Sequence, residues 1–217
     1  MATSQGSLSV MKYFAGMLVF GVVLGGLFAM GLIGPPAFPL NAAEIQHLET
    51  VPLQPIQQSM GIAQAYRAIP HNQVTYRSSK SVLNKEEAEY LEEAFFLVDL
   101  AVVERMTLLR TIQRNMNRPL RLDNYEQILK RFLTLAVPPG LDYFHDQVVA
   151  SIVEEKDYYQ GLQDQPSVTA VNLRHPLIQG THRRLVASHQ FLTKRYPQES
   201  RSNQQAFYEH LCALDFI

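Results

Sequence analysis

The chain opens with a long apolar run, which we interpret as a membrane span. Between Tyr13 and Ile33 no residue carries a charge. An α-helix rises about 1.5 Å per residue, so this run would reach roughly 30 Å, which is close to the hydrocarbon thickness of a bilayer. The pattern therefore predicts a transmembrane helix over residues 13–33. Signal-peptide cleavage after Ala43 stays an alternative, although the run is longer than the apolar core of most signal peptides.

The next segment, residues 34–83, is rich in proline and has no sustained apolar period. Its prolines are Pro35, Pro36, Pro39, Pro52, Pro55 and Pro70. Proline fixes φ and lacks the N–H that a helix interior or a sheet needs, so this composition favours extended, semi-rigid chain. We predict a spacer between the span and a folded domain.

From residue 84 onward, apolar residues recur at steps of three and four, which is the period of an amphipathic helix. The pattern predicts helices that begin near Asn84, Asp123, Leu141, His175 and Ser202. Asn84, Asp123 and Ser202 each precede a Glu or Gln by three residues, so we expect each to cap its helix in a reciprocal pair. Short proline- and glycine-containing turns separate several of them, and short connections force consecutive helices to run antiparallel. The predicted fold class is all-α, with one N-terminal transmembrane helix followed by a four- to five-helix antiparallel bundle over residues 84–217.

The charges that flank the apolar run predict its orientation. Lys12 is the only charged side chain before the run, and no lysine or arginine follows it until Arg67. Basic residues near a span stay on the cytoplasmic side. We therefore expect residues 1–12 to form a short cytoplasmic tail and the bulk of the chain to be periplasmic or otherwise extracytoplasmic. A bacterial inner membrane is the expected location, with a mitochondrial inner membrane as the alternative.

The overall charge argues against some classes of partner, and the cysteine content excludes an intrachain disulfide. The chain has 19 basic and 20 acidic residues, giving a net charge of −1, and the basic residues are scattered along it. This balance argues against nucleic acid as a partner, and no glycine-rich phosphate loop suggests a nucleotide. Cys212 is the only cysteine, so no intrachain disulfide forms, and we predict a small buried thiol there.

Within the predicted span, small residues recur every four positions at Gly21, Gly25 and Ala29. This spacing places them on one helix face, where a second helix can approach closely. They form a candidate helix-docking stripe. The alternative is chance, because glycine is common in transmembrane helices.

Three histidines in the fourth predicted helix, His175, His182 and His189, are spaced by seven residues. Seven residues cover about two turns, or roughly 10 Å, which is too far for neighbouring histidines to share one metal ion. His182 or His189 could bind a metal only with acids from another helix, and no such partner is recognisable. We therefore expect histidines at the edge of the core and no cofactor.

Asp99 interrupts an otherwise apolar stretch of the first helix in the bundle, so burial of a charge is plausible there. A buried carboxylate needs a partner, and we expect an arginine, a histidine or a backbone donor beside it. An ion pair that fixes helix register is favoured over a proton-handling role.

In the third predicted helix, we expect the four consecutive charged residues 154–157 to face water.

The sequence contains no serine-nucleophile elbow, His-Glu-x-x-His zinc motif or Cys-x-x-Cys-His haem motif. We therefore expect a non-enzymatic accessory, scaffold or assembly subunit of a membrane protein complex, with other membrane or envelope proteins as partners. The alternative is a metal- or haem-binding redox bundle. The sequence names no partner for the first and no complete ligand set for the second.

Overall fold

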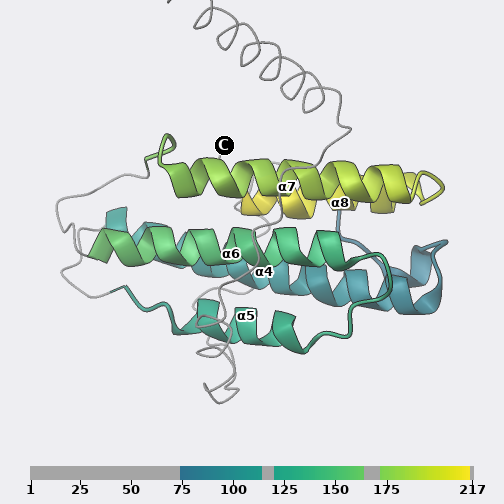
Figure 1. Ribbon diagram of the computed structural model, residues 1–217, viewed down its shortest axis with the longest axis horizontal. Coiled ribbons are helices and arrows are strands. Elements are labelled where there is room, and N and C mark those ends of the chain that lie inside the picture. The colour runs from purple at the N-terminus through teal and green to yellow at the C-terminus, as the bar shows by residue number, and fades with distance from the viewer. Residues whose placement is uncertain (1–73, 114–119, 164–171, 216–217) are drawn as a thin grey trace, which may run out of the picture. The chain divides into compact units, whose positions relative to one another are not determined.

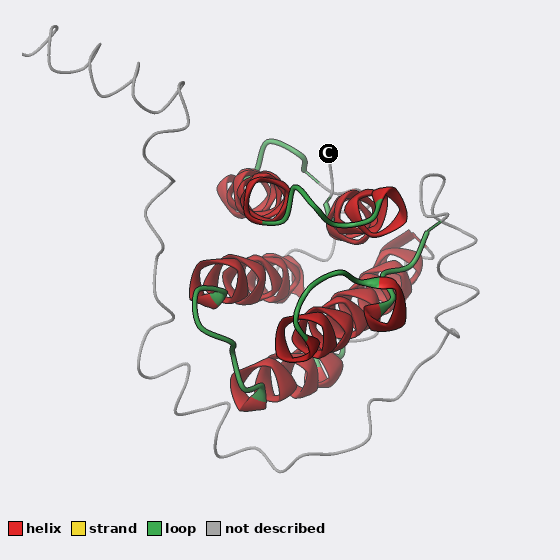
Figure 2. Cartoon of the chain, turned by 90° about the vertical axis from the view of Figure 1, so that its right-hand side faces the viewer, coloured by secondary structure: helices red, strands yellow, loops and turns green. Residues whose placement is uncertain are grey.

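The computed structural model describes residues 74–113, 120–163 and 172–215. These ranges hold five α-helices and one short 3-10 helix but no strand (Figure 2). The helices are α4 (Lys85–Gln113), α5 (Asp123–Thr134), α6 (Asp142–Gln163), α7 (Pro176–Arg195) and α8 (Arg201–Leu214), and the 3-10 helix is η1 (Ser78–Lys80) (Figure 1). The all-α prediction is thus confirmed for the described residues.

Each helix packs against the next one in the chain, and α8 returns to α4, so the five helices close a ring that a contact between α4 and α6 crosses (Figure 2). Paired residues give the directions. Asp99 and Arg105 of α4 meet His210 and Ala213 of α8, so these two helices run parallel. Phe132 of α5 packs on His145 near the start of α6, whereas Tyr125, earlier in α5, meets Glu155 later in α6, so these two run antiparallel.

Local capping chemistry explains where several helices begin. Asn84 accepts a hydrogen bond from the Glu87 N–H at 2.8 Å, as the sequence predicts. His175 caps α7 through Nδ1, which accepts from the Leu177 N–H at 3.3 Å, and Pro176 occupies the first helical position. The expected cap at Ser202 is wrong, because Ser200 performs this role for α8 by accepting from the Asn203 N–H at 3.2 Å.

The expected cap at Asp123 is also wrong. Asp123 is the first residue of α5, and the preceding Leu122 makes no side-chain cap bond. The Asp123 carboxylate instead accepts a hydrogen bond from Arg121 at 3.0 Å. The helix begins without the reciprocal pair, and its strongly amphipathic face, with Ile128, Leu129 and Phe132 fully buried, stabilises it through packing.

The aromatic centre of the core joins α4, α6 and α8. Phe95 lies 5.9 Å, between ring centroids, from both Phe144 and Phe207, and its ring stacks on the His210 imidazole at 4.7 Å. Tyr76, only 2 % exposed, adds a fourth aromatic ring from the segment before η1. Residues 74–83 therefore pack on the bundle, although their sequence composition placed them in the spacer.

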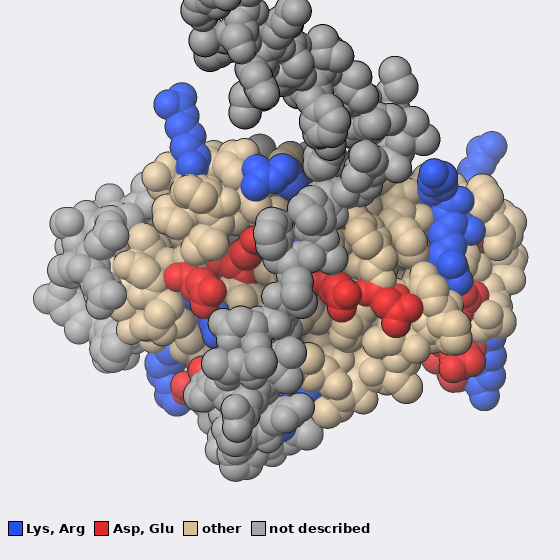
Figure 3. Space-filling view, in the orientation of Figure 1, with Lys and Arg blue, Asp and Glu red and all other residues tan. Residues whose placement is uncertain are grey.

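The predicted span at residues 13–33 lies outside the described residues, as do most of the predicted spacer and the stripe of Gly21, Gly25 and Ala29. Within residues 74–113, 120–163 and 172–215, no helix is both long enough and apolar enough to cross a membrane. On the face shown in Figure 3, acidic and basic side chains are interspersed with uncharged ones, in keeping with the near-zero net charge.

Candidate functional site

A groove between α7 and α8 brings together the candidate histidines and several further polar groups. Its cavity volume is about 260 Å³. The wall from α7 consists of His182, Leu185, Val186, His189 and Gln190, and the wall from α8 and the residue after it consists of Tyr208, Leu211, Cys212 and Asp215. Val186 and Tyr208 are 39 % and 47 % exposed, so an apolar side chain and an aromatic ring border the opening.

The heptad spacing on α7 explains how both histidines reach this groove. Ile178, Leu185 and Leu192 form the buried stripe of α7, and His182 and His189 lie beside it on the same side of the helix. His175, the first of the three, caps the helix and does not line the groove. The structure therefore brings two of the three histidines to one surface, but about two helical turns apart.

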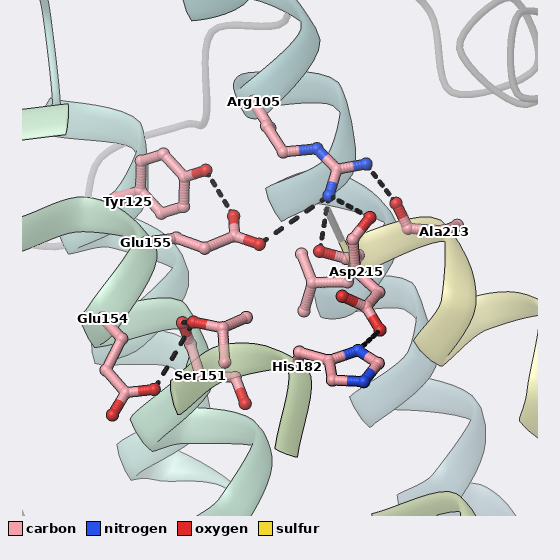
Figure 4. Close-up of polar contacts among 10 residues, drawn as sticks. Arg105, Tyr125, Ser151, Glu154, Glu155, His182, Ala213 and Asp215 are labelled. Carbon is pink, nitrogen blue, oxygen red and sulfur yellow. Dashed lines mark hydrogen bonds and ion pairs between the residues drawn. The ribbon is translucent and has the colours of Figure 1, made fainter. Parts of the chain in front are cut away.

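At one end of the groove, the side chains of His182 and Asp215 form a close hydrogen bond. The His182 Nδ1 lies 2.6 Å from the Asp215 Oδ2 (Figure 4). Asp215 follows α8, and its backbone carbonyl accepts a hydrogen bond from Arg105 of α4 at 3.0 Å. With Nδ1–H donated to the carboxylate, the Nε2 of His182 is the nitrogen available to a ligand in the groove.

At the other end, His189 packs edge-on against Tyr208, with ring centroids 5.5 Å apart. Burial lowers the pKa of His189, which favours the neutral imidazole. The neighbouring Cys212 thiol raises the pKa of the Tyr208 hydroxyl. Cys212 is half-buried and lines the groove, so the expectation of a buried thiol is wrong. The last turn of α8 buries Leu211 and Leu214 and leaves Cys212 at the edge.

In the described ranges, no group of three or more histidine, cysteine, aspartate or glutamate side chains is placed to hold a metal ion. The described residues therefore offer no further ligands to His182 and His189. Metal or haem binding at these histidines stays a prediction.

Asp99 lies inside the bundle at 5 % exposure, and its partner is His210 of α8. The Asp99 Oδ1 is 2.7 Å from the His210 Nδ1. His210 is itself 1 % exposed, and its Nε2 accepts a hydrogen bond from the backbone N–H of Tyr76 at 3.1 Å. A histidine partner is one of the three kinds expected for a buried carboxylate at this position. The pair joins α4, α8 and the segment before η1.

A second buried acid, Glu155 of α6, is fully buried, so the expectation that residues 154–157 all face water is wrong for this residue. Its Oε2 accepts a hydrogen bond from the Tyr125 hydroxyl at 2.8 Å, and its Oε1 lies 3.8 Å from the Arg105 guanidinium (Figure 4). Burial raises the pKa of Glu155 to about 7, while Arg105 and Tyr125 act in the opposite direction.

The sequence did contain a signal for this position. Ile152 and Tyr159 precede and follow Glu155 by three and four residues, and both are fully buried. The helical period therefore places Glu155 on the core face. The run of four charged residues suggested a solvated face, but consecutive helical residues point about 100° apart and cannot all share one face.

Arg105 connects the buried Glu155 cluster to the groove, because its guanidinium binds the C-terminal end of α8. Its guanidinium donates to the carbonyl oxygens of Ala213, Leu214 and Asp215 (Figure 4). The last carbonyls of a helix lack intrahelical partners and carry partial negative charge, so a buried cation is stabilised there. The same arginine lies beside the Glu155 carboxylate, and the Asp215 carboxylate in turn contacts the His182 imidazole. A polar chain thus runs from the core to the groove.

A further polar seam holds α6 against α7. Arg184 donates to Glu154 Oε1 at 3.1 Å and to Gln147 Oε1 at 3.2 Å. Burial raises the pKa of Glu154, and Arg184 opposes this effect. Gly180 of α7 lets the helices approach closely, because a Cβ at this position would lie 2.8 Å from the Glu154 carboxylate oxygens. These contacts fix the helix pair that forms the α7 side of the groove.

The chain matches no protein-family model, and no curated protein and no solved structure shows significant similarity to it. Its function therefore has to be inferred from its own residues.

Proposed function

We propose that this protein is a single-pass, membrane-anchored accessory, scaffold or assembly subunit of a membrane protein complex, without enzymatic activity of its own. The observation that carries the proposal is the uncharged apolar run from Tyr13 to Ile33, which has the length of a bilayer span and precedes a folded helical domain. In this arrangement the amino end is cytoplasmic and the bundle lies in the periplasm or another extracytoplasmic compartment.

The polar interior of the bundle supports a structural role. Asp99 pairs with His210, Glu155 with Arg105 and Tyr125, and Glu154 with Arg184. Each contact joins two different helices, so these polar contacts fix which helices are neighbours and in which register. Such pairs are retained where a unique arrangement matters, because they add little stability relative to apolar packing. A rigid bundle of this kind is suited to presenting a fixed surface to a partner.

The stripe of Gly21, Gly25 and Ala29 supplies a contact within the membrane in this proposal. Small residues at four-residue spacing let helix backbones approach closely, and van der Waals packing then drives association. We therefore expect a partner that contributes a transmembrane helix.

The test is purification of the tagged full-length protein from its native membrane in mild detergent, with mass spectrometry of the co-purifying proteins. We expect a defined set of membrane proteins in stoichiometric amount. The double variant Gly21→Leu, Gly25→Leu should lose them. The matched control is Gly16→Leu. It precedes Gly25 by nine residues, about two and a half turns, which is the opposite face of the predicted helix, and it should retain them.

Each other outcome has a distinct meaning. Recovery of the protein without partners would overturn the accessory role. Retention of the partners by the double variant would remove the stripe from the proposal but leave the accessory role intact. Release of the protein from membranes by alkaline carbonate would overturn the anchor, and metal or haem bound in stoichiometric amount would favour the redox alternative.

A further inference from the structure

The segment before α4 is held on α8 by an unusual set of contacts. We call residues 74–82 the strap. Four of its backbone N–H groups donate to side chains of α8 or of the residue pair just before that helix, and no β-strand is formed within the described residues. The Val74 N–H donates to Glu209 at 2.6 Å, the Tyr76 N–H to His210 at 3.1 Å, the Arg77 N–H to Asn203 at 3.3 Å and the Val82 N–H to Glu199 at 3.4 Å.

The strap and α8 run in opposite directions, and Tyr76 fixes their register. Its ring lies 5.7 Å from the Phe207 ring in a stacked arrangement and 5.6 Å from the Phe95 ring. Its hydroxyl donates to Ser81 at 3.1 Å. Burial raises the pKa of Tyr76 to about 12, so the phenol is neutral at physiological pH. The strap is thus seated by one aromatic residue and a series of backbone hydrogen bonds.

One of these bonds depends on the protonation state of its acceptor. A histidine nitrogen accepts a hydrogen bond only when it carries no proton. The His210 Nε2 accepts from the Tyr76 N–H, so the imidazole is neutral, with its proton on Nδ1 facing Asp99 at 2.7 Å. Because His210 is 1 % exposed, no water can replace either bond while the strap is in place.

The other ionisable groups around His210 define the response to acid. Asp99 faces it from α4, Glu209 precedes it on α8, and the Tyr76 phenol belongs to the strap. Phe95 covers one ring face. A proton added at Nε2 would create an imidazolium that still pairs with Asp99. It would also turn Nε2 into a donor directed at the Tyr76 N–H, so the two donors would repel one another.

We propose that the strap is an acid-released latch, seated on α8 while His210 is neutral and released when Nε2 takes up a proton. The sign follows from proton linkage. The closed state binds one proton fewer than the open state, so closure is favoured at high pH and is lost as the pH falls. One proton changes the ratio of open to closed molecules by at most about tenfold per pH unit. Histidine is the side chain suited to a change between pH 5 and 8.

Release would lengthen the connection between the bundle and whatever precedes it. The nine residues of the strap, fully extended, span roughly 30 Å. If the predicted span anchors the chain, release of the strap in acid lets the bundle move up to roughly 30 Å farther from the membrane. This consequence alone rests on the proposed function. The latch depends only on contacts among described residues.

Hydrogen–deuterium exchange of the full-length protein tests the latch. Rates at pH 7.5 and 5.5 are each divided by the intrinsic rate of an unstructured chain at that pH, which leaves the protection of each segment. We expect protection of the strap amides to fall by about tenfold or more at pH 5.5, as one proton over two pH units allows. The amides of α6 at residues 147–159 should keep theirs.

Two variants distinguish the contribution of His210 to the pH response from that of its neighbours. His210→Gln keeps a side chain that can accept from the Tyr76 N–H but cannot be protonated, so strap protection should become the same at both pH values. Glu209→Gln is the matched control, because it changes the adjacent acid that also holds the strap and leaves His210 in place. It should weaken the strap but preserve the pH response.

The latch is wrong if strap protection in the unmodified protein is equal at both pH values, or if His210→Gln retains the full pH response. Should that variant fail to fold, ¹⁵N NMR of the imidazole in the unmodified protein decides the question. We expect the neutral Nδ1–H form at pH 7.5 and an imidazolium that forms in step with loss of strap protection. An imidazolium in a protein whose strap stays protected would overturn the proposal.

Discussion

Glu155 shows at the scale of one residue how burial determines the behaviour of a charge. Its carboxyl group is fully buried between Tyr125 of α5 and Arg105 of α4. Removal from water disfavours the carboxylate, and Arg105 and Tyr125 recover only part of the loss. A group that would be ionised at neutral pH in an unfolded chain is therefore only partly ionised in the folded bundle.

This residue makes stability depend on pH with a definite sign. The pKa of Glu155 rises from 4.5 to about 7 on folding, so between these values the folded state binds more protons than the unfolded state. Its contribution to the free energy of unfolding therefore decreases as the pH rises from 5 to 7.5, by roughly 2 kcal/mol. Urea denaturation of the protein and of Glu155→Gln at both pH values measures it.

Glutamine cannot ionise, so the variant should lose this pH-dependent component and gain stability relative to the unmodified protein as the pH rises. Asp157→Asn, an exposed position two residues later on α6, is the control and should follow the unmodified protein. An equal pH dependence for Glu155→Gln and the unmodified protein would show that Glu155 is ionised at no extra cost.

At the scale of the element, the turn between α5 and α6 links the ends of two other helices. The turn between α5 and α6 contains Gly140 at φ 83°, a left-handed conformation that favours glycine. A Cβ there would lie 2.8 Å from the Arg195 Nη1. Arg195 in turn donates to the Pro139 carbonyl at 3.2 Å and to Glu87 at 3.0 Å, so this turn ties the end of α7 to the start of α4.

Two glycine substitutions should change stability in opposite directions. Gly140→Ala forces a side chain into the left-handed region and against Arg195, so we expect a loss of about 1–2 kcal/mol. Gly161 lies within α6, where an added Cβ would meet no atom within 4 Å, so Gly161→Ala should gain about 0.5–1 kcal/mol from helix propensity. Thermal unfolding followed by circular dichroism measures both. A shift of the same sign in both variants would contradict this account.

At the scale of the whole molecule, the strap belongs to the folded unit. Without it, Phe95 and Phe207 would lose their contact with Tyr76, and the His210 Nε2 would lose its donor. Ring closure between α4 and α8 depends on this same region, because the Asp99–His210 pair lies beneath the strap. While it is seated, the strap therefore adds to the stability of the domain.

A chain beginning at residue 74 should consequently be more stable than one beginning at residue 84, although both should fold. The reason is the loss of a buried aromatic residue together with its backbone hydrogen bonds. In the full-length protein, Tyr76→Ala should cost about 3–5 kcal/mol, in the range for large aromatic truncations. Thr75→Ala, an exposed neighbour, is the control. Equal urea midpoints for the two shortened chains would show that the strap is dispensable.

The sequence by itself determined the helical class, the approximate limits of the helices and most of the apolar core, because these follow from a local period of 3.6 residues and from proline and glycine at the turns. It also indicated that Asp99 would need a partner if buried. The cost of an unpaired buried charge is a general property and needs no knowledge of the fold.

Only the tertiary structure decided which residues meet across the ring. His210 lies 111 positions after Asp99, and Arg105 closes a helix whose last turn lies more than 100 residues later. No local pattern encodes such pairings, since they depend on how five helices pack together. The strap was missed for the same reason: residues 74–83 carry no helical period, and their order comes from α8 side chains brought beside them by the fold.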